Sequence, residues 1–158
     1  MTSCKFTSLT PAPLISLILL LVMHTAVFAQ AKPPAQQNPW SRSELLAPAE
    51  LARTIETQAK EQQPLILSVG PAAMIKGSVD LGAASDKQGL NKLKAILTAQ
   101  PKDKEIVIYC GCCPFTHCPN IRPAFNLLKE MHFTQAKLLN LEHNIRTDWI
   151  DKGYPSEN

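Results

Sequence analysis

Apolar residues recur at helical spacing in three segments of the chain, residues 48–60, 86–98 and 121–131,. Short apolar runs lie between them at 64–69 and 106–109, and a third follows at 137–141; their lengths and flanking turns predict buried strands,. A last short helix is expected over 145–152, ended by Gly153 and Pro155,. Because strands alternate with helices, the pattern predicts a single α/β domain with a parallel sheet flanked by helices.

The first residues have a different pattern. Lys5 precedes an apolar stretch at 14–23, and Val27 and Ala29 supply the small side chains of a cleavage site. This order is typical of a secretory signal peptide over residues 1–29, and the apolar stretch is too short for a membrane span, which needs about 20 residues. Residues 30–42 are rich in Pro, Gln and Ala and predict a flexible linker before a domain at 43–158,. We therefore expect an exported protein, periplasmic or secreted, with no membrane attachment after cleavage.

Composition narrows the function classes. The 158 residues fit one domain, and 45% hydrophobic residues are too many for a disordered chain,. Sixteen Lys and Arg against thirteen Asp and Glu leave a small positive excess with no basic run, which argues against a nucleic-acid partner,.

The cysteines are unevenly placed. Cys4 lies in the predicted leader, and the other four follow the strand at 106–109 within one short loop: Cys110, Cys112, Cys113 and Cys118. Cys110 comes directly after the strand and faces the start of the next helix. A helix dipole and loop amides lower the pKa of a thiol in such a place, so Cys110 is the candidate nucleophile.

The order of elements resembles a rhodanese-like (sulfurtransferase) domain over about residues 43–155. The residues that carry the resemblance are the strand IVIY ending in Cys110, the tail LEHN at 141–144, Trp149, and GYP at 153–155. The stretch CGCCPFTHCPNIRPAF resembles an exported bacterial subgroup with a CGCCP-type loop. His132 stands where the family usually has a helix-ending Gly, so this turn must accept His in the left-handed region.

The resemblance implies a function and no cofactor. Cys110 would take sulfane sulfur from thiosulfate or a persulfide donor, carry it as a persulfide, and pass it to a thiol acceptor. The expected partners are a small sulfur-containing anion or a thiol, and the sequence identifies no protein acceptor.

Roles for the neighbouring residues stay open. Arg122 is a candidate to bind an anionic donor, or an ordinary helix residue on the surface, and His117 is a weaker substrate-binding candidate. Cys112, Cys113 and Cys118 are candidate resolving thiols for Cys110, or Cys118 pairs with one of the other two in a structural disulfide.

The alternative function is a non-catalytic thiol, redox or soft-metal-binding module on the same frame. Thiolates together with His117 suit Cu(I) or Zn(II), but the spacing C-x-C-C-x₄-C matches no zinc template, so the main interpretation assigns no metal ligand.

Overall fold

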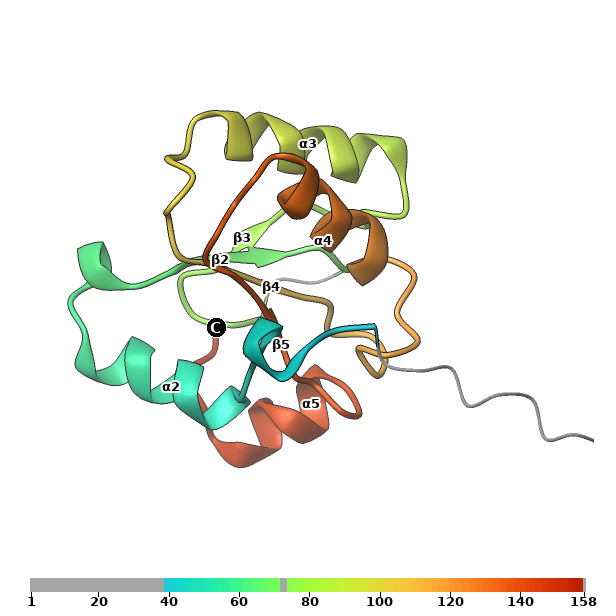
Figure 1. Cartoon of the computed structure of the whole chain (residues 1–158). Coiled ribbons are helices and arrows are strands. Elements are labelled where there is room, and N and C mark those ends of the chain that lie inside the picture. Colours follow the sequence, from blue (N-terminus) through green and yellow to red (C-terminus); the bar gives the residue numbers. More distant parts are fainter. Residues whose placement is uncertain (1–38, 72–73, 158) are drawn as a thin grey trace, which may run out of the picture. The chain divides into compact units, whose positions relative to one another are not determined.

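A computed structural model of the chain describes residues 39–71 and 74–157 (Figure 1). The predicted leader at 1–29 and most of the predicted linker at 30–42 lie outside the described residues. Within the part that the structure describes, no helix is long and apolar enough to cross a membrane.

The centre of the domain is a parallel sheet of five strands in the order β1-β5-β4-β2-β3. The strands are β1 (Leu45–Leu46), β2 (Leu65–Ser68), β3 (Val79–Asp80), β4 (Ile106–Tyr109) and β5 (Ala136–Leu139). All pairings within it are parallel, which confirms the predicted α/β class. Strands β1 and β3 were not predicted, because strands of two residues carry no periodic pattern and form only by pairing with β5 and β2.

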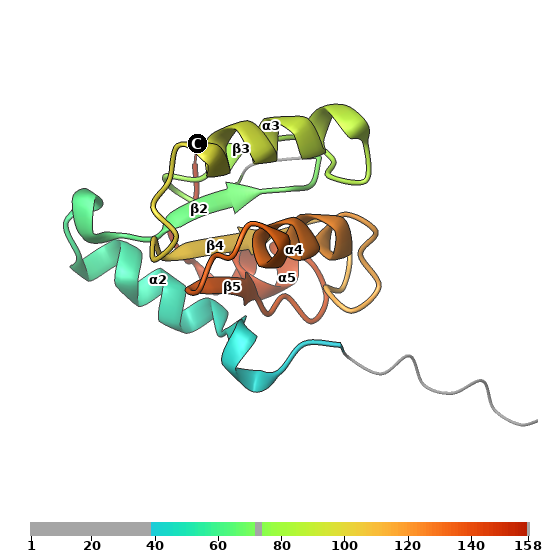
Figure 2. The same ribbon diagram turned by 45° about the horizontal axis from the view of Figure 1, so that its top comes forward.

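Among the described residues, four α-helices flank the sheet, with α3 and α4 on one face and α2 and α5 on the other (Figures 1 and 2). They are α2 (Pro48–Thr57), α3 (Lys87–Thr98), α4 (Ile121–Glu130) and α5 (Ile145–Asp148), with short 3-10 turns at η2 (Arg42–Glu44), η3 (Lys60–Gln62) and η4 (Ile150–Lys152). The predicted helix at 145–152 is two pieces, because Trp149 leaves the helical region with φ −131° and ψ −62°.

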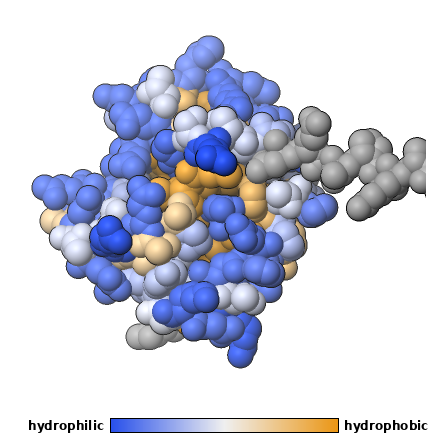
Figure 3. All heavy atoms as spheres, turned by 60° about the horizontal axis from the view of Figure 1, so that its bottom comes forward, coloured by the Kyte–Doolittle hydropathy of each residue, from blue (hydrophilic) through white to orange (hydrophobic). Residues whose placement is uncertain are grey.

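Strand β4 divides the apolar core into two layers. Successive side chains of a strand point to opposite faces. Ile106 and Ile108 therefore join the core under α3 and α4, while Val107 and Tyr109 join the core under α2 and α5. Cys110 continues the alternation on the α3 and α4 side. Seen from the side of α2 and α5, the surface is mostly hydrophilic, with a hydrophobic area near the centre of the view (Figure 3).

The turn after α4 confirms one expectation from the sequence. His132 adopts φ +62°, the left-handed conformation in which a Gly is more usual,. Gly153, with φ +72°, ends η4 in the same conformation,. Trp149 is fully buried and donates its indole N–H to the Pro155 carbonyl, so it is a core residue.

Candidate thiol site

The loop of residues 110–120 joins the carboxyl end of β4 to the start of α4 (Figure 2). Since β4 lies between β2 and β5, this loop occupies the middle of the edge where sites of parallel sheets form,. Neighbouring segments hold it in place: Phe115 N–H donates to the Leu141 carbonyl at 3.0 Å, and Ile145 N–H donates to the Gly111 carbonyl at 3.0 Å. The loop is therefore anchored to the segment that follows β5 and to α5.

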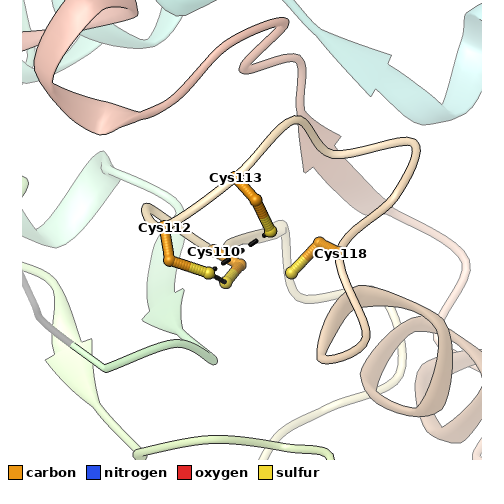
Figure 4. Close-up of side chains that lie close together, drawn as sticks. All are labelled: Cys110, Cys112, Cys113 and Cys118. Carbon is orange, nitrogen blue, oxygen red and sulfur yellow. Dashed lines mark hydrogen bonds between the residues drawn. The ribbon is translucent and has the colours of Figure 1, made fainter.

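The four cysteine side chains of this loop point toward a common centre (Figure 4). Their sulfur atoms all lie within 4.8 Å of one another, and all four are free thiols. Cys112 Sγ lies 3.3 Å from Cys110 Sγ and 3.3 Å from Cys113 Sγ. We call these four residues the thiol cluster.

Burial separates the members of the thiol cluster. Cys110 is 2% exposed and Cys118 is 1% exposed. Cys113 is partly buried, and Cys112 is exposed. The cluster therefore reaches from the apolar core under α3 and α4 to the surface, with Cys110 at its inner end and Cys112 at its outer end.

Two residues from other positions complete the surroundings of Cys110. A Cβ atom on Gly70, just after β2, would lie 2.7 Å from Cys110 Sγ, so only a glycine leaves room for this sulfur. Asn120 is buried directly before α4; its side-chain N–H donates to Cys110 Sγ at 3.5 Å and its carbonyl oxygen accepts from Ser85 N–H at 3.0 Å. Asn120 thus links the thiol to the loop before α3.

Hydrogen bonds to Cys110 favour its ionised form. They lower the pKa of Cys110 to about 5: the Cys118 thiol contributes most, burial opposes the shift, and the Cys112 backbone N–H, the Asn120 amide and the Cys112 thiol add to it,. Burial, and then the hydrogen bond to Cys110, raise the pKa of Cys112 to about 12. The pKa of Cys118 is also raised, chiefly because its proton is held in the bond to Cys110. At neutral pH, Cys110 is therefore a thiolate with two protonated thiols beside it.

The structure places the two predicted substrate-binding side chains in other contacts. The Arg122 guanidinium donates to the Thr116 carbonyl at 3.5 Å and lies 5.4 Å from the centre of the Trp40 ring. His117 is exposed, with its Nδ1 2.9 Å from Thr116 Oγ1. Both are on the loop or its helix, and their role toward a substrate stays a prediction.

Gly70 and Asn120 were not predicted from the sequence as residues of this site. Asn120 carried a weak signal, because Asn before a helix is a common N-cap. In the structure its side chain makes no cap hydrogen bond and binds Cys110 and Ser85 instead. Gly70 looked like the end of a strand, and nothing in its local sequence indicated a contact with a residue forty positions later.

The thiol cluster also has the dimensions of a metal site. Four thiolates around a tetrahedral Zn(II), at about 2.3 Å each, have sulfur–sulfur separations of roughly 3.8 Å. Two contacts in the cluster are 3.3 Å and no pair exceeds 4.8 Å. Small rotations of these side chains would therefore give a four-sulfur ligand set for a soft cation.

Comparison with known proteins gives a fold and no family. No protein-family model matches the chain, and no curated protein sequence matches it. A solved structure of EanB, with a cysteine persulfide in a tetrahedral intermediate state with ergothioneine, is similar to it with a TM-score of 0.51 and 17% sequence identity. The match covers 72% of this chain and 28% of the EanB chain. The chain thus shares the fold of part of EanB.

Proposed function

We propose that the protein is a sulfur-transferring enzyme of the rhodanese type, in which Cys110 carries sulfane sulfur as a persulfide. The observation that carries the proposal is the position of Cys110 Sγ, at the carboxyl end of the central strand and ringed by thiol, amide and backbone donors. These donors stabilise an anionic sulfur, which is the state of the nucleophile and of the persulfide alike.

The chemistry is a displacement at sulfur. The Cys110 thiolate attacks the outer sulfur of thiosulfate, a new S–S bond forms, and sulfite leaves with the electron pair of the broken bond. The negative charge on Cys110 passes to the terminal sulfur of the persulfide. A persulfide donor would react in the same way, with a thiolate as the leaving group, and a thiol acceptor later takes the sulfur from Cys110.

The fold and the sequence support this assignment from two sides. EanB, whose solved structure carries a cysteine persulfide, shares the fold at 17% identity. The order of elements resembles that of a rhodanese domain, and in it Cys110 follows directly after strand β4. We further propose that the predicted signal peptide exports the protein to the periplasm or the medium, where its thiols must be maintained by a reductant.

Cyanolysis of the sulfur-loaded protein tests the assignment. The chain is incubated with thiosulfate without oxygen, freed of small molecules, and treated with cyanide to release sulfane sulfur as thiocyanate. We expect nearly one equivalent from the wild type and from Cys113→Ser, the matched control within the cluster, and none from Cys110→Ser. Equal loading of Cys110→Ser and wild type would refute Cys110 as the carrier.

The four-sulfur geometry favours a second candidate, a soft-metal-binding module,. Anaerobic titration with Cu(I) or Zn(II) against a chromophoric chelator separates the two functions. Stoichiometric binding that single Ser replacements in the cluster weaken would favour the module, because each replacement removes one of the four sulfur ligands. Sulfur loading without metal retention would favour the enzyme.

A further inference from the structure

The buried position of Cys110 raises the question of how sulfur leaves it. Cys110 is 2% exposed, and Gly70, Asn120 and the other members of the thiol cluster surround its sulfur. Nucleophilic attack on a persulfide requires the acceptor sulfur to approach along the S–S axis. Because Cys110 is 2% exposed, an external thiol on a larger molecule has almost no direct access to its sulfur.

Cys112 bridges the gap between Cys110 and the surface. Its side chain is exposed, and its sulfur lies 3.3 Å from Cys110 Sγ. The residue between them fixes this approach: Gly111 accepts a hydrogen bond from Ile145 N–H at 3.0 Å, and a Cβ on Gly111 would lie 2.9 Å from the Ile145 side chain. The short separation of the two sulfurs is therefore held by packing against α5.

Cys113 provides an internal comparison. It too lies 3.3 Å from Cys112, but it is partly buried against the core under α3 and α4. Within the thiol cluster, Cys112 combines hydrogen-bonding contact with Cys110 and an exposed side chain.

We infer that Cys112 is the outlet of the site: it takes the sulfane sulfur from Cys110 and presents it to external thiols. This inference rests on the proposed function, because it needs a persulfide on Cys110. It adds a second catalytic residue and limits the acceptor class to thiols that meet the protein surface at Cys112.

The transfer step conserves atoms and total charge, and it needs no oxidant or reductant. Cys112 Sγ attacks the terminal sulfur of the Cys110 persulfide, the S–S bond to Cys110 breaks, and its electron pair returns to Cys110 Sγ. The proton of the Cys112 thiol passes to Cys110, so the negative charge stays on the moving sulfur. An external thiolate then attacks the persulfide on Cys112, and Cys112 leaves as the thiolate.

The test follows sulfur from each position. The full chain, with Cys4→Ser in every variant to remove the remaining thiol, is loaded with thiosulfate, alkylated, and mapped by fragmentation mass spectrometry. Transfer to reduced glutathione is measured in parallel as glutathione persulfide formed per loaded sulfur. Cys112→Ser keeps a hydroxyl that can donate to Cys110, and Cys113→Ser is the matched control.

We expect sulfane sulfur on both Cys110 and Cys112 in the wild type, and on Cys110 alone in Cys112→Ser. Transfer per loaded sulfur should fall on the order of a hundredfold in Cys112→Ser, as for loss of an intramolecular nucleophile, and stay near the wild-type rate in Cys113→Ser. Two results would contradict the role of Cys112 as outlet: undiminished transfer by Cys112→Ser, or a Cys110–Cys112 disulfide formed with release of hydrosulfide. Either result would leave Cys110 as the sulfur carrier. Absence of sulfur from Cys110 in both the wild type and Cys112→Ser would instead refute the proposed function.

Discussion

Tyr109 and Cys110 are neighbours at the end of β4, and they put polar groups into opposite cores. The Tyr109 hydroxyl lies under α2 and α5, where it accepts from the backbone N–H groups of Met74 and Ile75 at 3.1 and 3.3 Å. It also lies 3.0 Å from Ser78 Oγ. Cys110 lies under α3 and α4 and is held mainly by side chains, those of Cys112, Cys118 and Asn120. Both groups are buried and both have partners.

The difference between the two sites is in what surrounds them. Backbone N–H groups around the Tyr109 hydroxyl belong to the segment 74–78 and are fixed by the fold, so this hydroxyl ties the chain together. The donors around Cys110 are mostly thiols that can themselves react, and one of them reaches the surface. The Tyr109 hydroxyl is therefore structural because its partners are backbone groups, whereas Cys110 is reactive because most of its partners are thiols that can themselves react.

Gly70→Ala should disturb the reactive site most. The new Cβ would meet Cys110 Sγ at 2.7 Å, and this sulfur must move. A displacement of about 1 Å costs roughly a hundredfold in rate where geometry matters, so the rate of sulfur loading should fall by that order. Cyanolysis at successive times measures this rate, and urea unfolding measures stability. If the rate of loading stays at the wild-type level, the close packing of Gly70 against Cys110 is not needed for sulfur loading.

Tyr109→Phe should disturb the structural site and spare the reactive one. The ring still fills the core, but the N–H groups of Met74 and Ile75 lose their acceptor, and a buried donor left unpaired costs about 1–3 kcal/mol,. We expect the free energy of unfolding in urea to fall by that amount, with cyanolysable sulfur unchanged. Lost loading with unchanged stability would reverse the roles assigned to these two neighbours.

The smallest expected change is in the ionisation of Cys110. Its pKa is lowered to about 5, so its alkylation by iodoacetamide should rise through about pH 5 and be constant at neutral pH, where an ordinary thiol still gains rate with pH,. Cys118→Ala removes the largest cause of this lowering. A lost hydrogen bond to a charged group corresponds to roughly one to two units, so the midpoint should move upward by about that much.

Cys118→Ser is the control for this titration, because its hydroxyl can still donate to Cys110. Its midpoint should stay closer to that of the wild type. If both variants titrate like the wild type, then Asn120 and the Cys112 backbone N–H are sufficient to hold the thiolate, and Cys118 is a packing residue.

The local pattern was enough to predict much of the fold. Helices α3 and α4 and strand β4 lie within a few residues of their predicted ranges, because each has its own apolar periodicity and clear turn residues,. Strand β5 begins at Ala136 and ends at Leu139, slightly earlier than predicted. The edge strands β1 and β3 were missed, since pairing with a neighbour creates them and their own residues do not.

The sequence by itself determined that a cysteine would stand at the end of a buried strand with three more thiols in the loop after it. Tertiary structure alone decided how these thiols divide: Cys110 and Cys118 inward, Cys112 outward, with Gly70 and Asn120 closing the inner end. The physical reason is range. Periodicity reports which face of an element is buried, whereas the environment of a thiol depends on contacts between segments that are distant in the chain and meet only when the sheet forms.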